Sequence, residues 1–290
     1  MKDIINAQLK KNRDLNLLFK KLETEINIDE NFKQTLIKVK KENINNIDEL
    51  VEYTVKKTLE SIYEINQYLI ISKVDINDLK NIYFKTWNKL EETNSDKILI
   101  EHHKNLSEWI SKFYPKKFIN TLKENRKIGK VLNKEYKADI QKQVLDLNCE
   151  ELLEPIIDIG CGKNGILVKE LSKKYKNVIG IDRLITDQSQ YLIEIDWFDF
   201  VFENQKWGAV ISNMSFTNHM IYTLHNDKKN IFKYILKYKE ILDSLKMNGK
   251  FIYAPSLSFL EEKLDKQKYE IVSKKVINNY SMTKIIKKNI

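Results

Sequence analysis

Residues 155–165 constrain the fold of this chain more than any other segment. An apolar run that includes Ile156, Ile157 and Ile159 ends in a cluster of glycines, and residues 166–174 follow with a helical pattern. Glycine lets the backbone turn sharply and approach a ligand closely, because it has no Cβ. A strand, a tight turn and a helix in this order are typical of the opening of a nucleotide-binding α/β domain.

The charge next to the glycines indicates which nucleotide this loop binds. Gly160, Gly162 and Gly165 satisfy the dinucleotide pattern G-x-G-x-x-G, in which the loop holds a pyrophosphate at a helix N-terminus. Asp158 stands two residues before the first glycine, where its carboxylate would lie close to that anion. A cationic ligand is therefore favoured over a pyrophosphate.

With this acidic residue, the segment resembles the first motif of the class I S-adenosylmethionine-dependent methyltransferases. The resemblance implies that Asp158 lies near the methionine end of the cofactor, often acting through water on the amino group. It also implies that the loop of Gly160, Cys161 and Gly162 contacts the cofactor. One departure is that the third glycine, Gly165, stands one residue later than the position of Asn164, where the family often has glycine.

Two further strands of the pattern end in carboxylates. Residues 177–182 end in Asp182, which is 20 residues after Gly162, the spacing at which such folds place a ribose-binding acid. Residues 191–196 end in Asp196. This residue could bind a ligand, or it could only cap the turn after its strand. The resemblance implies that Asp196 binds the adenine amino group and that Trp197 or Phe198 packs on the adenine ring. The cofactor site implied by the resemblance also includes Arg183, Asn213, Tyr136 and Gln141.

The rest of the pattern predicts a doubly wound α/β sheet. A fourth strand is expected at residues 207–213, a long helix at 231–245 with a C-cap at 247–249, and a fifth strand at 251–254. Residues 269–276 and 282–287 predict a terminal antiparallel pair, which resembles the methyltransferase variant of the Rossmann-like fold. This resemblance covers about residues 135–290.

The first part of the chain has a different composition. Its first 128 residues contain no glycine and one proline, Pro115, so few residues there favour turns. We therefore predict an all-helical domain at residues 1–134, followed by the methyltransferase domain at 135–290. Helices are expected at residues 3–24, 32–39, 48–68, 75–90 and 97–113. Such an extension would form the acceptor pocket, a lid or a homodimer interface.

The residues after the fourth strand are candidates for the chemistry. Residues 212–227 contain two of the four histidines of the chain, His219 and His225. Histidine suits a general base near neutral pH, which a hydroxyl acceptor usually requires. A loose resemblance to O-methyltransferases with an N-terminal helical domain implies a catalytic histidine before the following helix. His219 fits the spacing of that family better, whereas residues 224–227 and the helix after them resemble its motif at His225, so the sequence does not choose between the two. Each could instead be a pocket-wall or surface residue.

Composition and motifs disfavour several classes of function. The net charge of +9 comes from lysine, with only three arginines, and is divided almost evenly between residues 1–148 and 149–290, so it does not indicate a tailored nucleic-acid surface. The segment Ser212–Ser215 lacks the Asn-Pro-Pro-Tyr and Asp-Pro-Pro-Tyr motifs of enzymes that methylate amino groups of bases. Cys149 and Cys161 have no neighbours at metal-ligand spacing. With no long apolar run and no signal peptide, we expect a cytoplasmic protein without a membrane span.

These patterns favour an enzyme that transfers a methyl group from S-adenosylmethionine to a small molecule or a peptide. An RNA methyltransferase is an alternative, motivated by the positive charge. A protein that binds the cofactor without turnover is another, because no catalytic residue is unambiguous. A nicotinamide oxidoreductase would rest on the glycine pattern alone.

Overall fold

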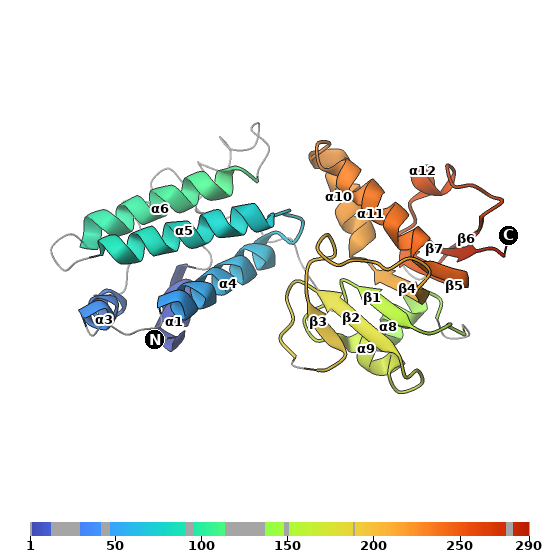
Figure 1. Cartoon of the computed structure of the whole chain (residues 1–290), viewed down its shortest axis with the longest axis horizontal. Helices are drawn as coiled ribbons and strands as arrows, with labels where there is room; N and C mark the ends of the chain where they lie inside the picture. The colour runs from blue at the N-terminus through green and yellow to red at the C-terminus, as the bar shows by residue number, and fades with distance from the viewer. Residues whose placement is uncertain are drawn as a thin grey trace. The chain divides into compact units, whose positions relative to one another are not determined.

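The computed structural model divides the chain into two compact units, Met1–Asn133 and Lys134–Ile290 (Figure 1). The structure describes residues 2–12, 30–41, 47–90, 95–113, 137–147, 151–187, 189–276 and 281–289. Among the described residues, no helix combines the length and the apolar character that crossing a bilayer requires.

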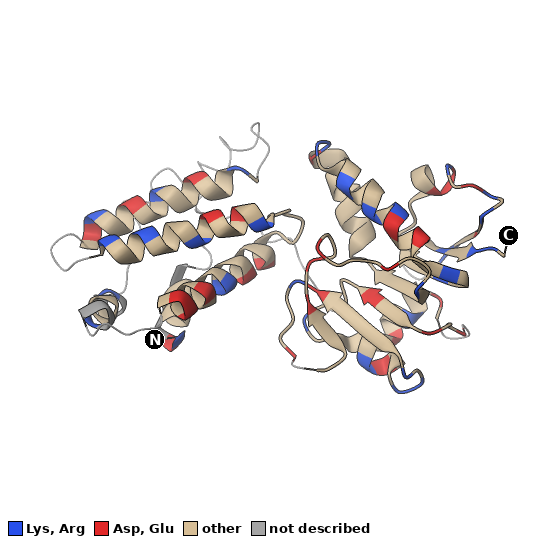
Figure 2. Ribbon diagram, in the orientation of Figure 1, with Lys and Arg blue, Asp and Glu red and all other residues tan. Residues whose placement is uncertain are grey.

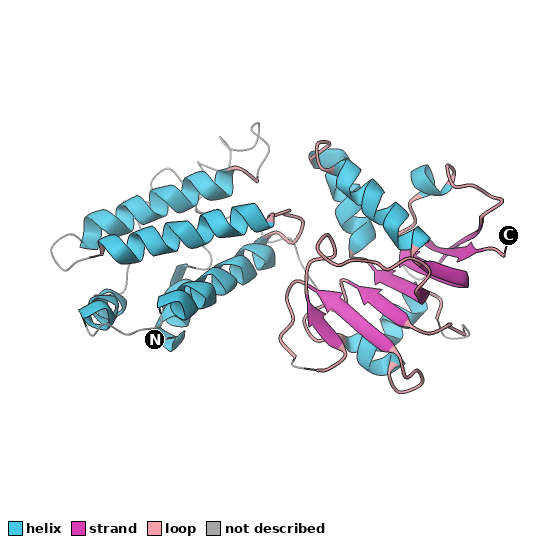
Figure 3. Ribbon diagram, viewed as in Figure 1, coloured by secondary structure: helices cyan, strands magenta, loops and turns pink. Residues whose placement is uncertain are grey.

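The described part of the first unit consists of helices and their connections (Figure 3). The helices are α1 (Lys2–Asn12), α3 (Glu30–Lys41), α4 (Ile47–Ile65), α5 (Lys73–Lys89) and α6 (Ser95–Ser111). Of the helix expected at residues 3–24, residues 13–24 lie outside the described part. The start of α5 is fixed by a capping box, in which the Asp75 amide donates to Ser72 Oγ and the Ser72 amide donates to Asp75 Oδ2.

The helices of this unit pack through apolar positions three or four residues apart. Val51, Val55 and Ile62 of α4 are buried, as are Leu79 and Trp87 of α5. This spacing puts the buried residues of one helix on one face, and the polar residues between them face outwards. The unit therefore forms its core from the amphipathic pattern that the sequence predicts.

The second unit is built on one seven-stranded sheet (Figure 3). Its strands are β1 (Ile156–Ile159), β2 (Val178–Asp182), β3 (Leu192–Glu194), β4 (Trp207–Asn213), β5 (Leu245–Ala254), β6 (Tyr269–Lys275) and β7 (Ser281–Lys287). The order is β3-β2-β1-β4-β5-β7-β6; the first five strands are parallel, and β7 and β6 form an antiparallel hairpin. The predicted α/β class and the C-terminal hairpin are confirmed.

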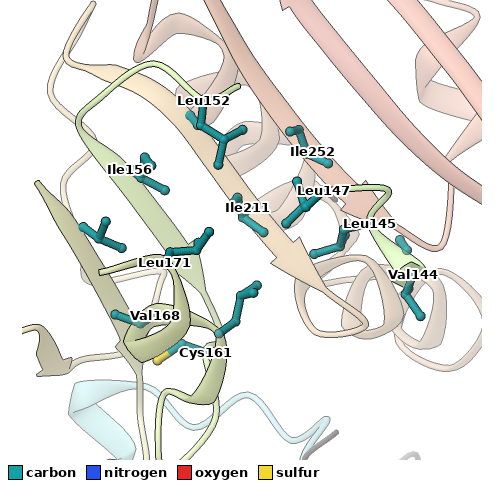
Figure 4. Packing of buried hydrophobic residues seen from close by; sticks show 14 of the residues in the cluster. Val144, Leu145, Leu147, Leu152, Ile156, Cys161, Val168, Leu171, Ile211 and Ile252 are labelled. Atoms are coloured by element: carbon teal, nitrogen blue, oxygen red, sulfur yellow. The ribbon is translucent and has the colours of Figure 1, made fainter. Parts of the chain in front are cut away.

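Helices cover both faces of the sheet (Figure 1). They are α8 (Ala138–Val144), α9 (Ile166–Leu171), α10 (Phe216–Asn226), α11 (Ile231–Asp243) and the short α12 (Ser258–Glu261). Ile156, Ile211 and Ile252 pack with Val168 of α9 in one buried layer (Figure 4). Because side chains alternate along a strand, Ile157 points to the opposite face, where α10 and α11 pack on β4 and β5.

The predicted helix C-cap at residues 247–249 is wrong, because these residues lie inside β5. Helix α11 ends at Asp243, and β5 begins two residues later. The pairing of β4 with β5 is irregular here: Trp207 opposes Leu245, whereas Ala209 opposes Lys250. A Cβ at Gly249 would lie 2.9 Å from the Trp207 carbonyl oxygen and 2.8 Å from that of Lys246. Glycine is therefore needed here because the irregular pairing of β4 with β5 leaves no room for a Cβ, and not because a helix ends here.

A buried network on the second unit gives a stability prediction. Glu261 is buried, and its Oε1 accepts hydrogen bonds from the Tyr253 hydroxyl (2.8 Å) and the Leu257 amide (2.6 Å), while the Tyr238 hydroxyl lies 3.0 Å from that of Tyr253. Tyr253→Phe removes a donor from a buried carboxyl group and is expected to lower the free energy of unfolding by about 2 kcal/mol. Tyr238→Phe removes a bond to another hydroxyl, so we expect about 1 kcal/mol. Urea unfolding measures both, and a larger loss in Tyr238→Phe would contradict this assignment.

Candidate functional site

The strand order places a topological switch point at the carboxyl ends of β1 and β4. These strands are neighbours, but the chain continues from β1 towards β2 and β3 on one side and from β4 towards β5 on the other. Open α/β sheets bind ligands at such a switch point. The glycine loop follows β1 here, and Gly160, Gly162 and Gly165 have φ of +69°, +80° and +56°. These are left-handed conformations that favour glycine.

Asp158 is a buried carboxyl group without a hydrogen-bond partner. Its side chain belongs to a residue that is 1% exposed, and neither of its oxygens has a partner among the described residues. Burial raises the pKa of Asp158 to about 7, and the nearby Asp182 carboxylate contributes to this shift. A buried carboxyl group without a partner is destabilising unless a hydrogen-bond donor or a cation contacts it. Asp158 therefore fits a cationic or N–H-donating ligand.

Asp182 lies at the end of β2 and is bonded to the glycine loop. Its Oδ2 accepts a hydrogen bond from the Gly162 amide (3.0 Å), and its Oδ1 accepts one from the Leu184 amide (2.9 Å). Burial raises the pKa of Asp182, although the two amides and Arg183 oppose that shift. In a dinucleotide site the loop amides would donate to a pyrophosphate, whereas here the Gly162 amide donates to the Asp182 carboxylate. The loop is therefore poorly suited to an anion.

Asp196 and Arg183 lie beside each other after β3 and β2. Strand β3 ends at Glu194, so Asp196 is in the turn that follows and not in the strand expected at residues 191–196. Its Oδ1 accepts a hydrogen bond from the Phe198 amide (2.9 Å), and its Oδ2 is 3.9 Å from Arg183 Nη1. Asp196 thus caps its turn, and its second oxygen faces the only arginine of the described residues.

Two serines that the sequence did not single out fix the loop after β1. Ser215 Oγ donates to the Ile159 carbonyl oxygen (2.6 Å), and Ser212 Oγ lies 3.3 Å from the same oxygen and 2.9 Å from Ser215 Oγ. A Cβ at Gly160 would lie 2.6 Å from Ser215 Cβ and 3.1 Å from Trp197 Cζ3. Gly160 is therefore required by its neighbours as well as by its φ. Only their position could have indicated them, since Ser212 lies in the last part of β4 and Ser215 follows it.

Trp197 forms an aromatic wall with residues of α10. Its ring lies edge-to-face with His219, at 4.8 Å between ring centroids, and with Phe216 at 5.9 Å. The Nε1 of Trp197 is buried without a hydrogen-bond partner, as is Oδ1 of Asn213 at the end of β4. Two buried polar atoms that lack partners near the loop are further groups that a ligand could satisfy.

The two candidate histidines lie on one helix but in different environments. Helix α10 is absent from the sequence-based prediction, although Phe216, Met220 and Thr223 recur at helical spacing and are buried. His219 is buried against Trp197, and burial lowers its pKa well below the ordinary value, so its imidazole is neutral. His225 is exposed in the last turn of α10. The structure therefore brings His219, and not His225, next to Trp197.

The remaining predicted cofactor residues have different positions. The Cys161 side chain is buried against Gly180 in the layer shared with α9, and its amide donates to the Ile181 carbonyl oxygen (3.1 Å). Gln141 is buried on α8. Tyr136 lies outside the described residues.

About half of this chain is similar in structure to several solved proteins that are named as methyltransferases. No protein-family model and no curated protein matches it. N-methyltransferase NodS from Bradyrhizobium japonicum is 12% identical, covering 52% of this chain and 96% of that chain, with a TM-score of 0.35. The 1,6-didemethyltoxoflavin-N1-methyltransferase of Burkholderia thailandensis is 12% identical over 53% and 76% of the two chains, with a TM-score of 0.35. SMU.1697c of Streptococcus mutans, in complex with S-adenosylhomocysteine, is 21% identical over 52% and 93%, with a TM-score of 0.32.

Proposed function

We propose that this chain is an S-adenosylmethionine-dependent methyltransferase. The observation that carries the proposal is the buried, unpartnered carboxyl group of Asp158 beside a glycine loop whose Gly162 amide is already taken by Asp182. S-adenosylmethionine carries a sulfonium and an ammonium group, whereas a nicotinamide dinucleotide carries a pyrophosphate. Three carboxyl groups with one arginine at the same sheet edge favour the cation.

Each carboxyl group has a role that its position supports. Asp158 would hold the amino group of the cofactor, directly or through water, and Asp182 keeps a free lone pair on each oxygen for a ribose hydroxyl. Asp196 would bind the adenine amino group through Oδ2, and Trp197 would pack on the ring. The cofactor supplies an activated methyl group when bound. The protein then has to align the acceptor with that group and, for a hydroxyl acceptor, remove a proton.

We propose His219 and not His225 as the general base, because α10 buries His219 next to Trp197 whereas His225 is exposed. His219→Gln is expected to lower kcat about 100-fold, the lower range for loss of a general base, with little change in cofactor affinity. His225→Gln, on the same helix but exposed, serves as the matched control and should leave kcat unchanged. A larger effect of His225→Gln would overturn this assignment. An acceptor that needs no deprotonation would leave kcat of both variants at the wild-type value.

We favour a small-molecule or peptide acceptor over RNA. Basic side chains are interspersed with acidic ones in the described parts of both units (Figure 2). In the first unit, for example, Lys89 pairs with Glu101 at 2.8 Å and Lys112 with Asp78 at 3.1 Å. Such pairing reduces the positive electrostatic potential that would attract the phosphate backbone of RNA. We keep residues 1–134 as the part that supplies the acceptor pocket, a lid or a dimer interface, and the cytoplasm as the proposed location.

Transfer of a labelled methyl group tests this function. Purified full-length protein is incubated with methyl-labelled S-adenosylmethionine and, separately, the small-molecule, peptide and RNA fractions of a cell extract. We expect label in the small-molecule or peptide fraction, and none with Asp158→Asn. Label in RNA would support the alternative of an RNA methyltransferase. Cofactor binding with no transfer to any fraction would support a protein that binds S-adenosylmethionine without turnover.

A further inference from the structure

The first unit contains a cavity of about 190 Å³ that is partly open to solvent. Residues of α1, α3, α4, α5 and α6 line it. Since these helices all belong to the first unit, the cavity lies in that unit alone. Most of its wall is apolar, with Val51, Ile62, Leu90 and Leu99 among its residues. A concave, mostly apolar site with a few polar groups is the usual form of a small-molecule site in a protein. The cavity therefore has the form of a small-molecule site.

The described residues that line the cavity carry no formal charge. Two of them are titratable histidines, and both are kept neutral: burial lowers the pKa of His102 to about 3 and that of His103 to about 4. Burial also raises the pKa of the Tyr83 hydroxyl to about 12, so it stays protonated. A charged ligand would lose its hydration without gaining a counter-charge here.

Polar groups converge at one end of the cavity. The Thr58 and Tyr83 hydroxyls are 2.7 Å apart, and Tyr83 and His102 are in ring contact at 4.9 Å. Thr86 Oγ1 donates to the Ile82 carbonyl oxygen (2.9 Å) and lies 2.8 Å from His102 Nδ1. Since the Thr86 proton is engaged, His102 Nδ1 is the donor of that pair, which leaves His102 Nε2 as an acceptor.

The neighbouring His103 adds a second polar atom. Its Nδ1 is buried and has no hydrogen-bond partner. Buried polar atoms of native proteins are nearly always satisfied, so an orphan beside a cavity is a group that a bound molecule can satisfy. The cavity thus has an apolar body and a neutral polar end with free hydrogen-bonding capacity.

We infer that the helical unit binds a small, uncharged molecule made of one aromatic ring or a short alkyl group with a single hydroxyl. The size follows from the volume, because a cavity of about 150 Å³ accommodates benzene. The apolar walls hold the ring, and the hydroxyl donates to His102 Nε2 at the polar end. This inference does not depend on the methyl-transfer function of the second unit.

Calorimetric titration of the full-length protein with 4-ethylphenol tests the inference. We expect one site with a Kd on the order of 100 µM, within the limits for a ligand of about nine heavy atoms. The anion 4-ethylbenzoate, of nearly the same shape, is expected to bind at least 30-fold more weakly. Equal binding of the two probes, or no heat with 4-ethylphenol at 1 mM, would overturn the inference.

Two variants test whether 4-ethylphenol binds in the cavity. Thr86→Val removes the hydroxyl that fixes the His102 tautomer and is expected to weaken 4-ethylphenol binding about tenfold, without changing the affinity for ethylbenzene. Thr35→Val is the matched control, because Thr35 Oγ1 donates to the Asn31 carbonyl oxygen (2.7 Å) but does not line the cavity. Ser61→Phe fills the cavity and should abolish binding with no loss of Tm. Unchanged 4-ethylphenol affinity in both Thr86→Val and Ser61→Phe would contradict binding at this place.

If the molecule bound here is the methyl acceptor, 4-ethylphenol competes with it and raises its KM. If the molecule is an effector, KM for the acceptor does not rise in proportion to the fraction of cavities that 4-ethylphenol fills. Binding of S-adenosylmethionine and binding of 4-ethylphenol are measured in separate titrations. Failure of the methyl-transfer proposal can therefore be distinguished from failure of this inference.

Discussion

Replacing Asp158 with asparagine is expected to abolish binding of S-adenosylmethionine while making the unliganded protein more stable above pH 7. Asparagine keeps the shape of the side chain but cannot become an anion. The gain arises because Asp158 is buried without a partner, so its ionised form is destabilising in the folded state. The same carboxylate is the group that would meet the cationic end of the cofactor.

The sign of the pH dependence follows from the raised pKa. Asp158 has a pKa of about 7 in the folded chain against 3.8 for an unperturbed group, so the folded state holds its proton more tightly. The contribution of Asp158 to stability is fully present below about pH 4 and is lost as pH rises through about 7. A shift of this size corresponds to roughly 2–4 kcal/mol once the group is ionised.

Urea unfolding at pH 4.5 and pH 8 measures this effect. Asp158→Asn should be close to wild type at pH 4.5 and more stable by roughly 2–4 kcal/mol at pH 8. Glu262→Gln removes an exposed carboxyl group of the same unit and should change little at either pH. If Asp158→Asn were less stable than wild type at pH 8, Asp158 would have a partner that the structure does not show.

Gly160→Ala is expected to destabilise the second unit by about 3–5 kcal/mol and to remove cofactor binding. Two effects add here. The residue has φ of +69°, which strains any side chain, and the new Cβ would lie 2.6 Å from Ser215 Cβ. The loop would have to move away from Ile159 and from the hydrogen bond that Ser215 makes to its carbonyl oxygen.

A double variant separates the clash from the strain. Ser215→Gly alone loses the hydrogen bond to the Ile159 carbonyl oxygen, and combining it with Gly160→Ala removes the clash but leaves the strained φ. We expect the double variant to recover about 1–2 kcal/mol relative to the sum of the single effects, measured by urea unfolding. Additive effects would show that the strained backbone, and not Ser215, makes glycine necessary at this position.

Local patterns in the sequence predict the parts of the fold that depend on local structure. The apolar runs predict β4 with the observed bounds and a strand before the glycine loop, where β1 lies. The carboxylates at the strand ends predict where the candidate site lies. Asp158 could be recognised because an acid before a glycine loop is unfavourable for an anionic ligand. Its burial and its lack of a partner depend on the surrounding layer and are visible only in the structure.

Features that depend on distant contacts could not be predicted in this way. Gly249 looks like a helix cap in sequence, but its role is set by the Trp207 carbonyl oxygen, 42 residues away along the chain. Ser215 reaches the Ile159 carbonyl oxygen across 56 residues, and no local spacing indicates that bond. The sequence does not choose between the two histidines of residues 212–227, whereas α10 buries His219 and exposes His225.

The most direct test is calorimetric titration of the purified chain with S-adenosylmethionine, S-adenosylhomocysteine and NADH at pH 8 and pH 6. We predict binding of the first two and no binding of NADH. Because Asp158 must lose a proton to receive the cation, affinity should be about tenfold weaker at pH 6 than at pH 8. Binding of NADH with no binding of S-adenosylmethionine or S-adenosylhomocysteine at either pH would contradict the proposed function.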